Sequence, residues 1–325
     1  MDSRLLAYLK LQEPTDEEVV ELLYALILRR APEDEARERC LAKLAEGTLS
    51  VATLVHELAG ATEFERVRLL DDAVALAAGA RARGERPRLL TAPAGTDERL
   101  IEIPWVLSRV PPDGPVLEVG YAFAEPSYLA ALIAACRGRL TGVDLAVAEV
   151  PGLEAIEADV RSLPFADGSF RTILLVSTLE HVGADNAHYG HAGSTDEGAR
   201  VDALRELRRV LAPAGRLLVT VPTGEPGDHV WFRQEDVAGW TKLFAQAGLF
   251  VEEQEVYELG EGGWCAAPTF DAEGVHYGER GPAASAVLCA ELSSRSLSSR
   301  LSPDAITRTA RRKGAPFWRR LRPRV

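Results

Sequence analysis

The pattern of apolar residues predicts a small helical bundle over residues 1–70. Thr15 and Glu18 have the spacing of a capping box, in which the two residues satisfy backbone N–H groups of the first helical turn. The apolar positions that follow return at helical spacing, and Ser50 is a residue type that begins a further helix. Residues 71–94, rich in Ala, Arg and Gly, are predicted to form a helix that runs into a linker.

From residue 95 the pattern changes to short apolar runs separated by helical stretches, which is typical of an α/β fold with a parallel sheet covered on both faces. The predicted strands are 115–120, 139–144, 153–158, 171–177, 216–221, 250–257 and 284–292. The predicted helices are 127–136, 197–211 and 234–247. We therefore expect one domain over residues 95–302, followed by a basic tail at 303–325.

Polar residues stand at the ends of the predicted strands. Glu118 and Gly120 end the first strand, Asp144 ends the second, Asp159 follows the third and His181 follows the fourth. Ligands of such sheets bind beyond the carboxyl ends of the strands. The sequence therefore predicts that these residues line one pocket.

Three longer segments resemble the class I S-adenosylmethionine-dependent methyltransferases. They are LPFADGSF at 163–170, LEHV at 179–182 and LRELRRVLAPAGRLLVTVP at 204–222, and they follow one another in the family's order. The resemblance implies a Rossmann-like seven-stranded methyltransferase sheet with helices on both faces, plus the small N-terminal helical bundle. Residues 22–64 are in turn similar to a helical module joined to bacterial glycosyltransferases and methyltransferases.

The resemblance implies S-adenosylmethionine as the cofactor, held at the strand ends. Asp144 would accept both ribose hydroxyls, as acids at this position do in related nucleotide-binding folds. Asp159 would face the adenine amino group, and Glu118 would stand near the methionine portion. The implied cofactor-binding residues are Glu118, Gly120, Tyr121, Ala122, Asp144, Leu145, Asp159, Val160, Ser177 and Leu179.

The first loop departs from the family's E/D-x-G-x-G-x-G pattern, because Ala122 and Ala124 replace the second and third glycines. Alanine resists positive φ by about 1 kcal/mol. Either the loop keeps ordinary φ angles, or cofactor binding is weakened and the chain is a non-catalytic cofactor-binding or scaffolding relative. A nicotinamide oxidoreductase is disfavoured, since its G-x-G-x-x-G motif is missing.

The polar segment 181–197 follows the fourth strand, where a methyl acceptor is expected. His181 is the candidate catalytic base, because a group of near-neutral pKa suits removal of the acceptor proton. An equally good role for His181 is shaping the loop. No metal site is predicted, since no metal motif matches the spacing of His181, Asp185, His188, His191 and Asp196.

The acceptor is expected to be a small molecule or a saccharide, with O-methylation favoured. The E-H-V-G segment beginning at Glu180 looks like that of bacterial methyltransferases found with sugar and polysaccharide genes. Aromatic side chains that could line its pocket are Tyr189, Trp231, Phe232 and Trp264.

Composition and charge narrow the choice of partners. Of 325 residues, 46% are hydrophobic and 26% charged, as in globular proteins. Residues 303–325 carry eight Lys or Arg and one acid, a net +7, which leaves −19 for residues 1–302 within the overall −12. The acidic body disfavours nucleic acid, whereas the tail either contacts an anionic surface or packs on that body. Four scattered cysteines, no signal-like start and no long apolar run predict a cytoplasmic protein without a membrane span.

Overall fold

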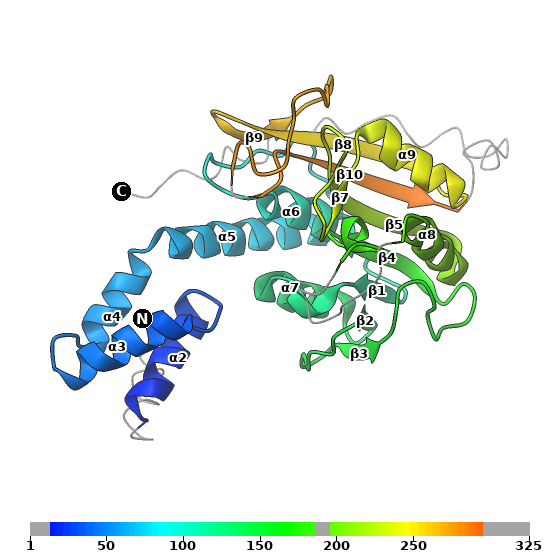
Figure 1. The fold of residues 1–325 in the computed structure, drawn as a ribbon. Coiled ribbons are helices and arrows are strands. Elements are labelled where there is room, and N and C mark those ends of the chain that lie inside the picture. The colour runs from blue at the N-terminus through cyan, green and yellow to red at the C-terminus, as the bar shows by residue number, and fades with distance from the viewer. Residues whose placement is uncertain (1–13, 186–195, 282, 295–325) are drawn as a thin grey trace. The chain divides into compact units, whose positions relative to one another are not determined.

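The computed structural model describes most of the chain, namely residues 14–185, 196–281 and 283–294 (Figure 1). The chain divides into two compact units, Met1–Asp72 and Ala73–Val325. The candidates that lie outside the described residues are His188, Tyr189, His191 and the basic tail at 303–325. Of the described helices, none is both long and apolar enough to cross a membrane.

The first unit contains three short helices, α2 (Asp16–Ile27), α3 (Asp34–Ala45) and α4 (Val51–Ala59), which share an apolar core. The capping box is present. Thr15 Oγ1 accepts the N–H of Glu18 at 3.3 Å, and the Glu18 carboxylate accepts the N–H of Thr15 at 2.8 Å. Ser50 Oγ accepts the N–H of Thr53 at 3.1 Å. The predicted starts of the first and third helices are thus confirmed.

Helix α5 (Thr62–Ala82) spans the boundary between the two units. Its buried residues are Val67, Leu70, Ala73, Val74, Ala77 and Ala80. This helical spacing continues through residue 71, so one continuous helix stands where the pattern predicted a bundle helix and a separate linker helix.

The second unit is built on one sheet of eight strands in the order β3-β2-β1-β4-β5-β10-β8-β9. The strands are β1 (Val116–Val119), β2 (Leu140–Asp144), β3 (Glu154–Glu157), β4 (Phe170–Val176), β5 (Leu211–Pro222), β8 (Phe250–Gly260), β9 (Gly263–Ala266) and β10 (Ala286–Ser293). Central β1 is buried at every position, whereas edge strand β3 is not, which explains its weaker apolar pattern.

The Rossmann-like α/β fold is confirmed, with two differences in the sheet. Strands β1 to β5 pair in parallel, but β10 runs antiparallel to both β5 and β8. The sheet also has eight strands rather than seven, because the chain turns after Gly260 and β9 pairs with β8 as a hairpin. Neither difference is visible in a pattern of apolar runs, which carries no strand direction.

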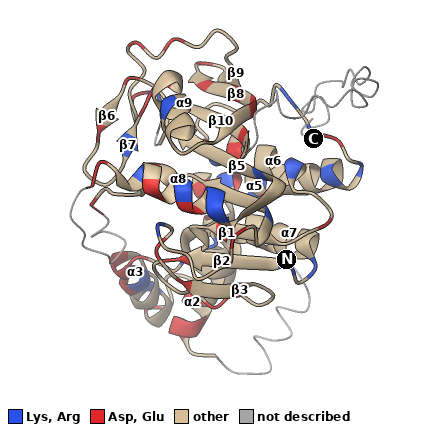
Figure 2. Cartoon of the chain, turned by 90° about the vertical axis from the view of Figure 1, so that its right-hand side faces the viewer, with Lys and Arg blue, Asp and Glu red and all other residues tan. Residues whose placement is uncertain are grey.

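Helices flank the sheet as predicted. They are α7 (Pro126–Cys136), α8 (Ala199–Val210) and α9 (Val237–Gln246). Trp240 and Phe244 of α9 and Leu204 and Leu207 of α8 are fully buried in the core beside the sheet. The outer face of α8 carries basic and acidic residues side by side (Figure 2), among them Asp202 and Arg205, whose side chains lie 2.9 Å apart.

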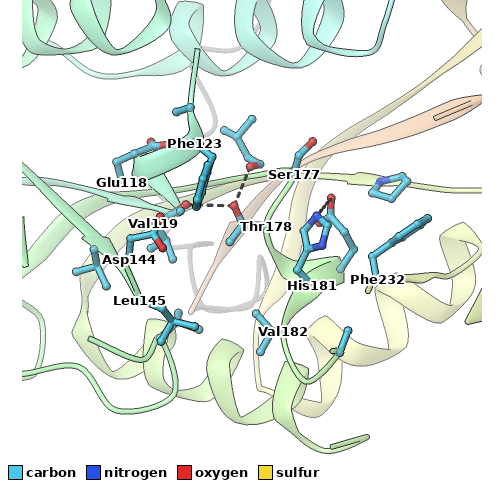
Figure 3. A pocket seen from close by; sticks show the side chains of 18 of the residues that line it. Glu118, Val119, Phe123, Asp144, Leu145, Ser177, Thr178, His181, Val182 and Phe232 are labelled. Carbon is cyan, nitrogen blue, oxygen red and sulfur yellow. Dashed lines mark hydrogen bonds and ion pairs between the residues drawn. The ribbon is translucent and has the colours of Figure 1, made fainter. Parts of the chain in front are cut away.

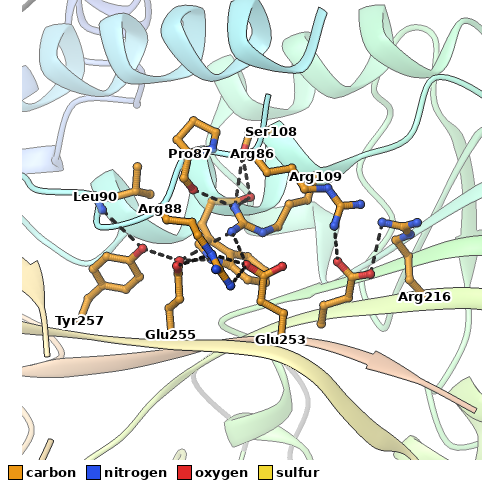
Figure 4. Close-up of polar contacts among 12 residues, drawn as sticks. Arg86, Pro87, Arg88, Leu90, Ser108, Arg109, Arg216, Glu253, Glu255 and Tyr257 are labelled. Atoms are coloured by element: carbon orange, nitrogen blue, oxygen red, sulfur yellow. Dashed lines mark hydrogen bonds and ion pairs between the residues drawn. The ribbon is translucent and has the colours of Figure 1, made fainter. Parts of the chain in front are cut away.

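Helix α6 (Arg99–Arg109) was not predicted from the sequence. All of its residues except Arg99 are buried, including Pro104, so it lacks the alternation of exposed and buried positions that reveals a surface helix. Arg109, Arg88, Glu253 and Glu255 form a polar cluster between the 86–109 segment and β8 (Figure 4). The cluster fixes α6 against the sheet.

Candidate functional site

A cavity of about 470 Å³ opens at the carboxyl ends of β1, β2 and β4. It is lined by Glu118 and Gly120 after β1, by Asp144 at the end of β2, and by residues that follow β3 and β4. Figure 3 shows Asp144, Leu145 and Glu118 on one side of this cavity and His181 and Phe232 on the other, with Thr178 between them. The strand ends predicted to carry the site therefore meet in one place.

Asp144 organises the loop after β1. Its Oδ2 accepts the N–H of Ala122 at 3.0 Å, and its Oδ1 accepts the N–H of Ala146 at 3.3 Å. Each oxygen keeps a second lone pair, so the carboxylate is able to accept ribose hydroxyls while holding the loop. Leu145 lines the cavity beside it.

The loop itself needs a glycine at one position. Gly120 has a φ of +85°, and a Cβ there would collide with the Thr178 side chain. The short 3₁₀ turn η1 (Tyr121–Phe123) follows, and the φ of Ala124 is −72°. Neither Ala122 nor Ala124 has a positive φ. The two alanines are therefore unstrained, which removes the conformational objection to cofactor binding.

Glu118 is a buried carboxyl facing the cavity. It is 1% exposed, and it accepts a hydrogen bond from the Tyr128 hydroxyl at 2.9 Å. Burial raises its pKa to about 8, although the Tyr128 hydrogen bond opposes the rise. Near neutral pH the Glu118 carboxyl is therefore mostly protonated.

Asp159 and Val160 line the cavity next to β2, as predicted. Arg161 holds the Asp159 carboxylate at 2.6 Å through its Nη2 and donates its backbone N–H at 2.8 Å. The Arg161 hydrogen bonds lower the pKa of Asp159, although partial burial opposes them. The sequence did not anticipate this guanidinium, which also lines the cavity.

Three of the predicted cofactor residues do not line the cavity. The ring of Tyr121 is buried, and its hydroxyl donates to the Ala148 carbonyl at 3.0 Å and accepts the Ala148 N–H at 3.1 Å. Leu179 is buried in the core, and Ala122 meets Asp144 through its backbone. Tyr121 thus ties down the loop after β2 instead of facing the cavity.

Ser177 lines the cavity in a strained backbone conformation. Its φ of +44° lies in the left-handed region, which costs a non-glycine residue on the order of 1 kcal/mol. Its hydroxyl donates to Glu102 Oε1 and Oε2 at 2.9 and 2.8 Å. The fully buried Glu102 therefore reaches the cavity wall through Ser177.

His181 ends the 3₁₀ turn η2 (Leu179–His181) and lines the cavity. Its Nδ1 lies 2.9 Å from the Trp231 carbonyl oxygen, and the two rings stack with centroids 5.2 Å apart. A carbonyl oxygen only accepts, so Nδ1 must donate to it; the basic lone pair of the neutral ring is then on Nε2. Trp231 and Phe232 both line the cavity, whereas Trp264 is buried elsewhere and donates to the Thr96 carbonyl at 3.0 Å.

The cavity also contains charged residues that sequence reasoning missed. Glu98, Arg99 and Glu180 line it beside His181, together with Tyr277 from the segment before β10. Glu180 belongs to the LEHV segment named above, but nothing in the sequence signals its burial or that of Glu98. In the described part of the chain, no three His, Cys, Asp or Glu side chains are grouped to hold a metal ion.

Comparison with known proteins shows what part of the chain is similar to. Residues 117–219 match the model of a methyltransferase domain family. The C-methyltransferase UbiE of ubiquinone and menaquinone biosynthesis from Hahella chejuensis is 30% identical over 105 residues, which are 32% of this chain and 36% of that protein. The mouse protein named "Probable tRNA methyltransferase 9B" is 28% identical over 108 residues, 33% of this chain and 22% of its own length.

The chain thus spans about a third or less of the curated relatives it matches. Among solved structures, a Burkholderia thailandensis 1,6-didemethyltoxoflavin-N1-methyltransferase aligns with 84% of this chain and 90% of its own, at 15% identity and a TM-score of 0.40. The matched segment 117–219 contains β2 to β4 and most of β1 and β5, the strands that build the cavity. The part of the chain that builds the cavity is therefore similar to a methyltransferase domain family.

Proposed function

We propose that the protein transfers a methyl group from S-adenosylmethionine to a hydroxyl of a small-molecule or saccharide acceptor. The observation that carries the proposal is one continuous cavity with Asp144 at one end and His181 at the other. The aromatic walls at Trp231 and Phe232 suit the faces of sugar rings as well as planar rings.

The bound cofactor would supply a methyl group activated by a positive sulfonium. Asp144 would accept its ribose hydroxyls, and the Arg99 guanidinium would bind its carboxylate at the methionine end. Glu118, once ionised, would favour a positive charge nearby. Positioning of this kind lowers a bimolecular barrier by several kcal/mol.

His181 would act on the acceptor. The Trp231 carbonyl orients the ring through Nδ1, so that Nε2 takes the hydroxyl proton as the oxygen attacks the methyl carbon and the carbon–sulfur bond breaks. A general base of this kind contributes about 10²–10⁴-fold to the rate. The products are the methylated acceptor, a proton on His181 and S-adenosylhomocysteine.

The cofactor half is tested with Asp144→Ala. Affinity for S-adenosylhomocysteine, measured by calorimetry, should fall at least about tenfold, or about 1.4 kcal/mol. Asp202→Ala removes an exposed carboxylate on α8 and serves as the matched control, with unchanged affinity expected. If Asp144→Ala binds as tightly as the wild type, the assigned cofactor site is wrong.

The acceptor half is tested with His181→Ala and His181→Asn, using an acceptor found by screening small molecules and saccharides. The Asn side chain retains an N–H that can donate to the Trp231 carbonyl but has no basic nitrogen. Both variants should lose about 10²-fold or more in turnover while keeping their affinity for S-adenosylhomocysteine. Normal turnover by His181→Asn would show that His181 is a positioning residue rather than the base.

A further inference from the structure

The part of the cavity beside His181 forms a recess with two acidic and three aromatic residues. Glu98 precedes the first residue of α6, Glu180 belongs to η2, and Tyr277 comes from the segment before β10. Trp231 and Phe232 complete what we call the acceptor recess, and all five residues line the cavity. Asp144 and Asp159 line other parts of the same cavity, at the ends of β2 and β3.

The two carboxyls of the acceptor recess are buried and poorly paired. Glu180 is 3% exposed and Glu98 is 7% exposed. Among the described residues, Glu180 Oε2 has no hydrogen-bond partner, and Glu180 Oε1 lies 3.8 Å from His181 Nε2. Glu98 Oε2 accepts the backbone N–H of Ala284 at 3.2 Å.

The nearby cation does not compensate these groups fully. Arg99 Nη1 lies 3.7 Å from Glu98 Oε1 and 3.8 Å from Glu102 Oε2, and Arg99 Nε lies 3.9 Å from Glu125. One guanidinium thus approaches three carboxyls, each from beyond hydrogen-bond distance. The proposed function already gives Arg99 to the cofactor carboxylate, which would reduce its effect on Glu98 further.

Resting on the proposed methyl transfer, we propose that the acceptor carries a protonated amino group and that the acceptor recess binds this ammonium. Buried carboxylates without partners are costly, and a bound cation offsets that cost. A neutral hydroxyl would supply one hydrogen bond to Glu180 but no charge. The ammonium would serve as an anchor, while a neighbouring hydroxyl receives the methyl group.

The aromatic rings favour the same class of ligand. The Phe232 and Tyr277 rings pack with centroids 4.5 Å apart, and the Trp231 ring lies 4.6 Å from that of Phe232. Ring faces attract ammonium groups by about 0.5–2 kcal/mol, most strongly where water is excluded. Burial raises the pKa of Glu98 to about 7 and that of Glu180 well above its ordinary value, so both carboxyls gain from a nearby positive charge.

The test compares two probes of one shape, 2-phenylethylamine and 2-phenylethanol, on full-length protein saturated with S-adenosylhomocysteine. Binding is measured by ligand-observed NMR. Wild-type protein should bind the amine at least about tenfold more tightly than the alcohol. Glu180→Gln and Glu98→Gln keep the side-chain shape and should each lose most of this preference, whereas the exposed control Glu261→Gln should keep it.

Other outcomes separate the two proposals. If S-adenosylhomocysteine does not bind, the proposed function itself fails. If it binds but the amine has no advantage, or Glu180→Gln keeps the advantage, only the ammonium assignment is overturned. If Glu180→Gln weakens binding of S-adenosylmethionine but not of S-adenosylhomocysteine, which lacks the sulfonium charge, Glu180 serves the sulfonium and the assignment is likewise overturned.

Discussion

The two ends of helix α6 carry buried charges in opposite states of compensation. At the C-terminal end, the Arg109 guanidinium donates to Glu253 at 3.1 Å, and its side chain is fully buried (Figure 4). At the N-terminal end, Glu98 approaches Arg99 only to 3.7 Å and faces the cavity. One helix thus links a paired cluster that holds it to the sheet with an acidic end that lines the proposed site.

This comparison of the two ends of α6 separates charges that stabilise the fold from charges that are available to bind a ligand. A buried ion pair loses its compensation when one partner is removed, which is strongly destabilising. A buried carboxyl that lacks a partner already bears that cost in the folded protein, so its neutralisation should not destabilise the fold. The carboxyls of the cavity are therefore better explained by a ligand than by a structural role.

The largest effect is expected for Arg109→Ala. Among the described residues, the change leaves the exposed Arg88 as the cation that pairs with Glu253 and Glu255. It also empties the space against Trp105, whose ring lies 4.0 Å from the guanidinium. The free energy of unfolding should fall by about 3–5 kcal/mol. Urea unfolding followed by tryptophan fluorescence measures it. A loss well below 1 kcal/mol would contradict a structural role for the paired cluster.

An intermediate effect is expected from the pH dependence of Glu118→Gln. The pKa of Glu118 is about 8 in the folded protein against 4.5 for an ordinary glutamate, so the folded state binds more protons between these values. The stability that this carboxyl contributes is complete below about pH 4.5 and is lost as the pH rises to about 8, by a few kcal/mol in total. Glu118→Gln should remove that part of the slope in urea unfolding between pH 5 and 8.

Glu253 supplies the opposite sign as a control. Burial opposes the change, but Arg109 and Arg88 lower its pKa below the ordinary value. Its stabilising contribution is therefore present above the ordinary pKa of a glutamate and is lost as the pH falls through its own. If Glu253→Gln and Glu118→Gln changed the slope in the same direction, the contrast between the two regions would be wrong.

The smallest effect is expected for Arg88→Ala. Arg88 contacts the same carboxylate as Arg109, at 2.7 Å from Glu253, but its side chain is 61% exposed against 0% for Arg109. Water and salt screen such a pair, so the unfolding free energy should fall by less than about 1 kcal/mol. A loss as large as that of Arg109→Ala would show that burial does not set the strength of this cluster.

Much of the fold was predictable because its signals are local. The capping box at Thr15 depends on residues three apart, and the strands at residues 115–120 and 139–144 are marked by short apolar runs. Helix α6 was not predicted because it is buried on every side, so its sequence lacks the alternation of apolar and polar positions that marks a surface helix. Strand β9 was missed because a short edge hairpin gives too few residues for a pattern.

The candidate site likewise contains residues that the sequence predicted and residues that it did not. Glu118, Gly120, Asp144 and Asp159 were found because strand ends converge in a parallel sheet. The inward turn of Tyr121 and Leu179 was not predictable, since adjacent loop residues face opposite directions for reasons of packing. Glu98 and Tyr277 were missed because they come to the cavity from distant parts of the chain.

By itself, the sequence determined the alternation of strands and helices and the acids at the strand ends, because these depend on neighbours along the chain. Only the tertiary structure decided which carboxyls are paired. Arg109 and Glu253 lie far apart in sequence but 3.1 Å apart in space, whereas adjacent Glu98 and Arg99 do not reach hydrogen-bond distance. Whether a buried charge is compensated depends on its distance from an opposite charge and on the exclusion of water in the folded chain. Neither quantity can be read from the order of the residues.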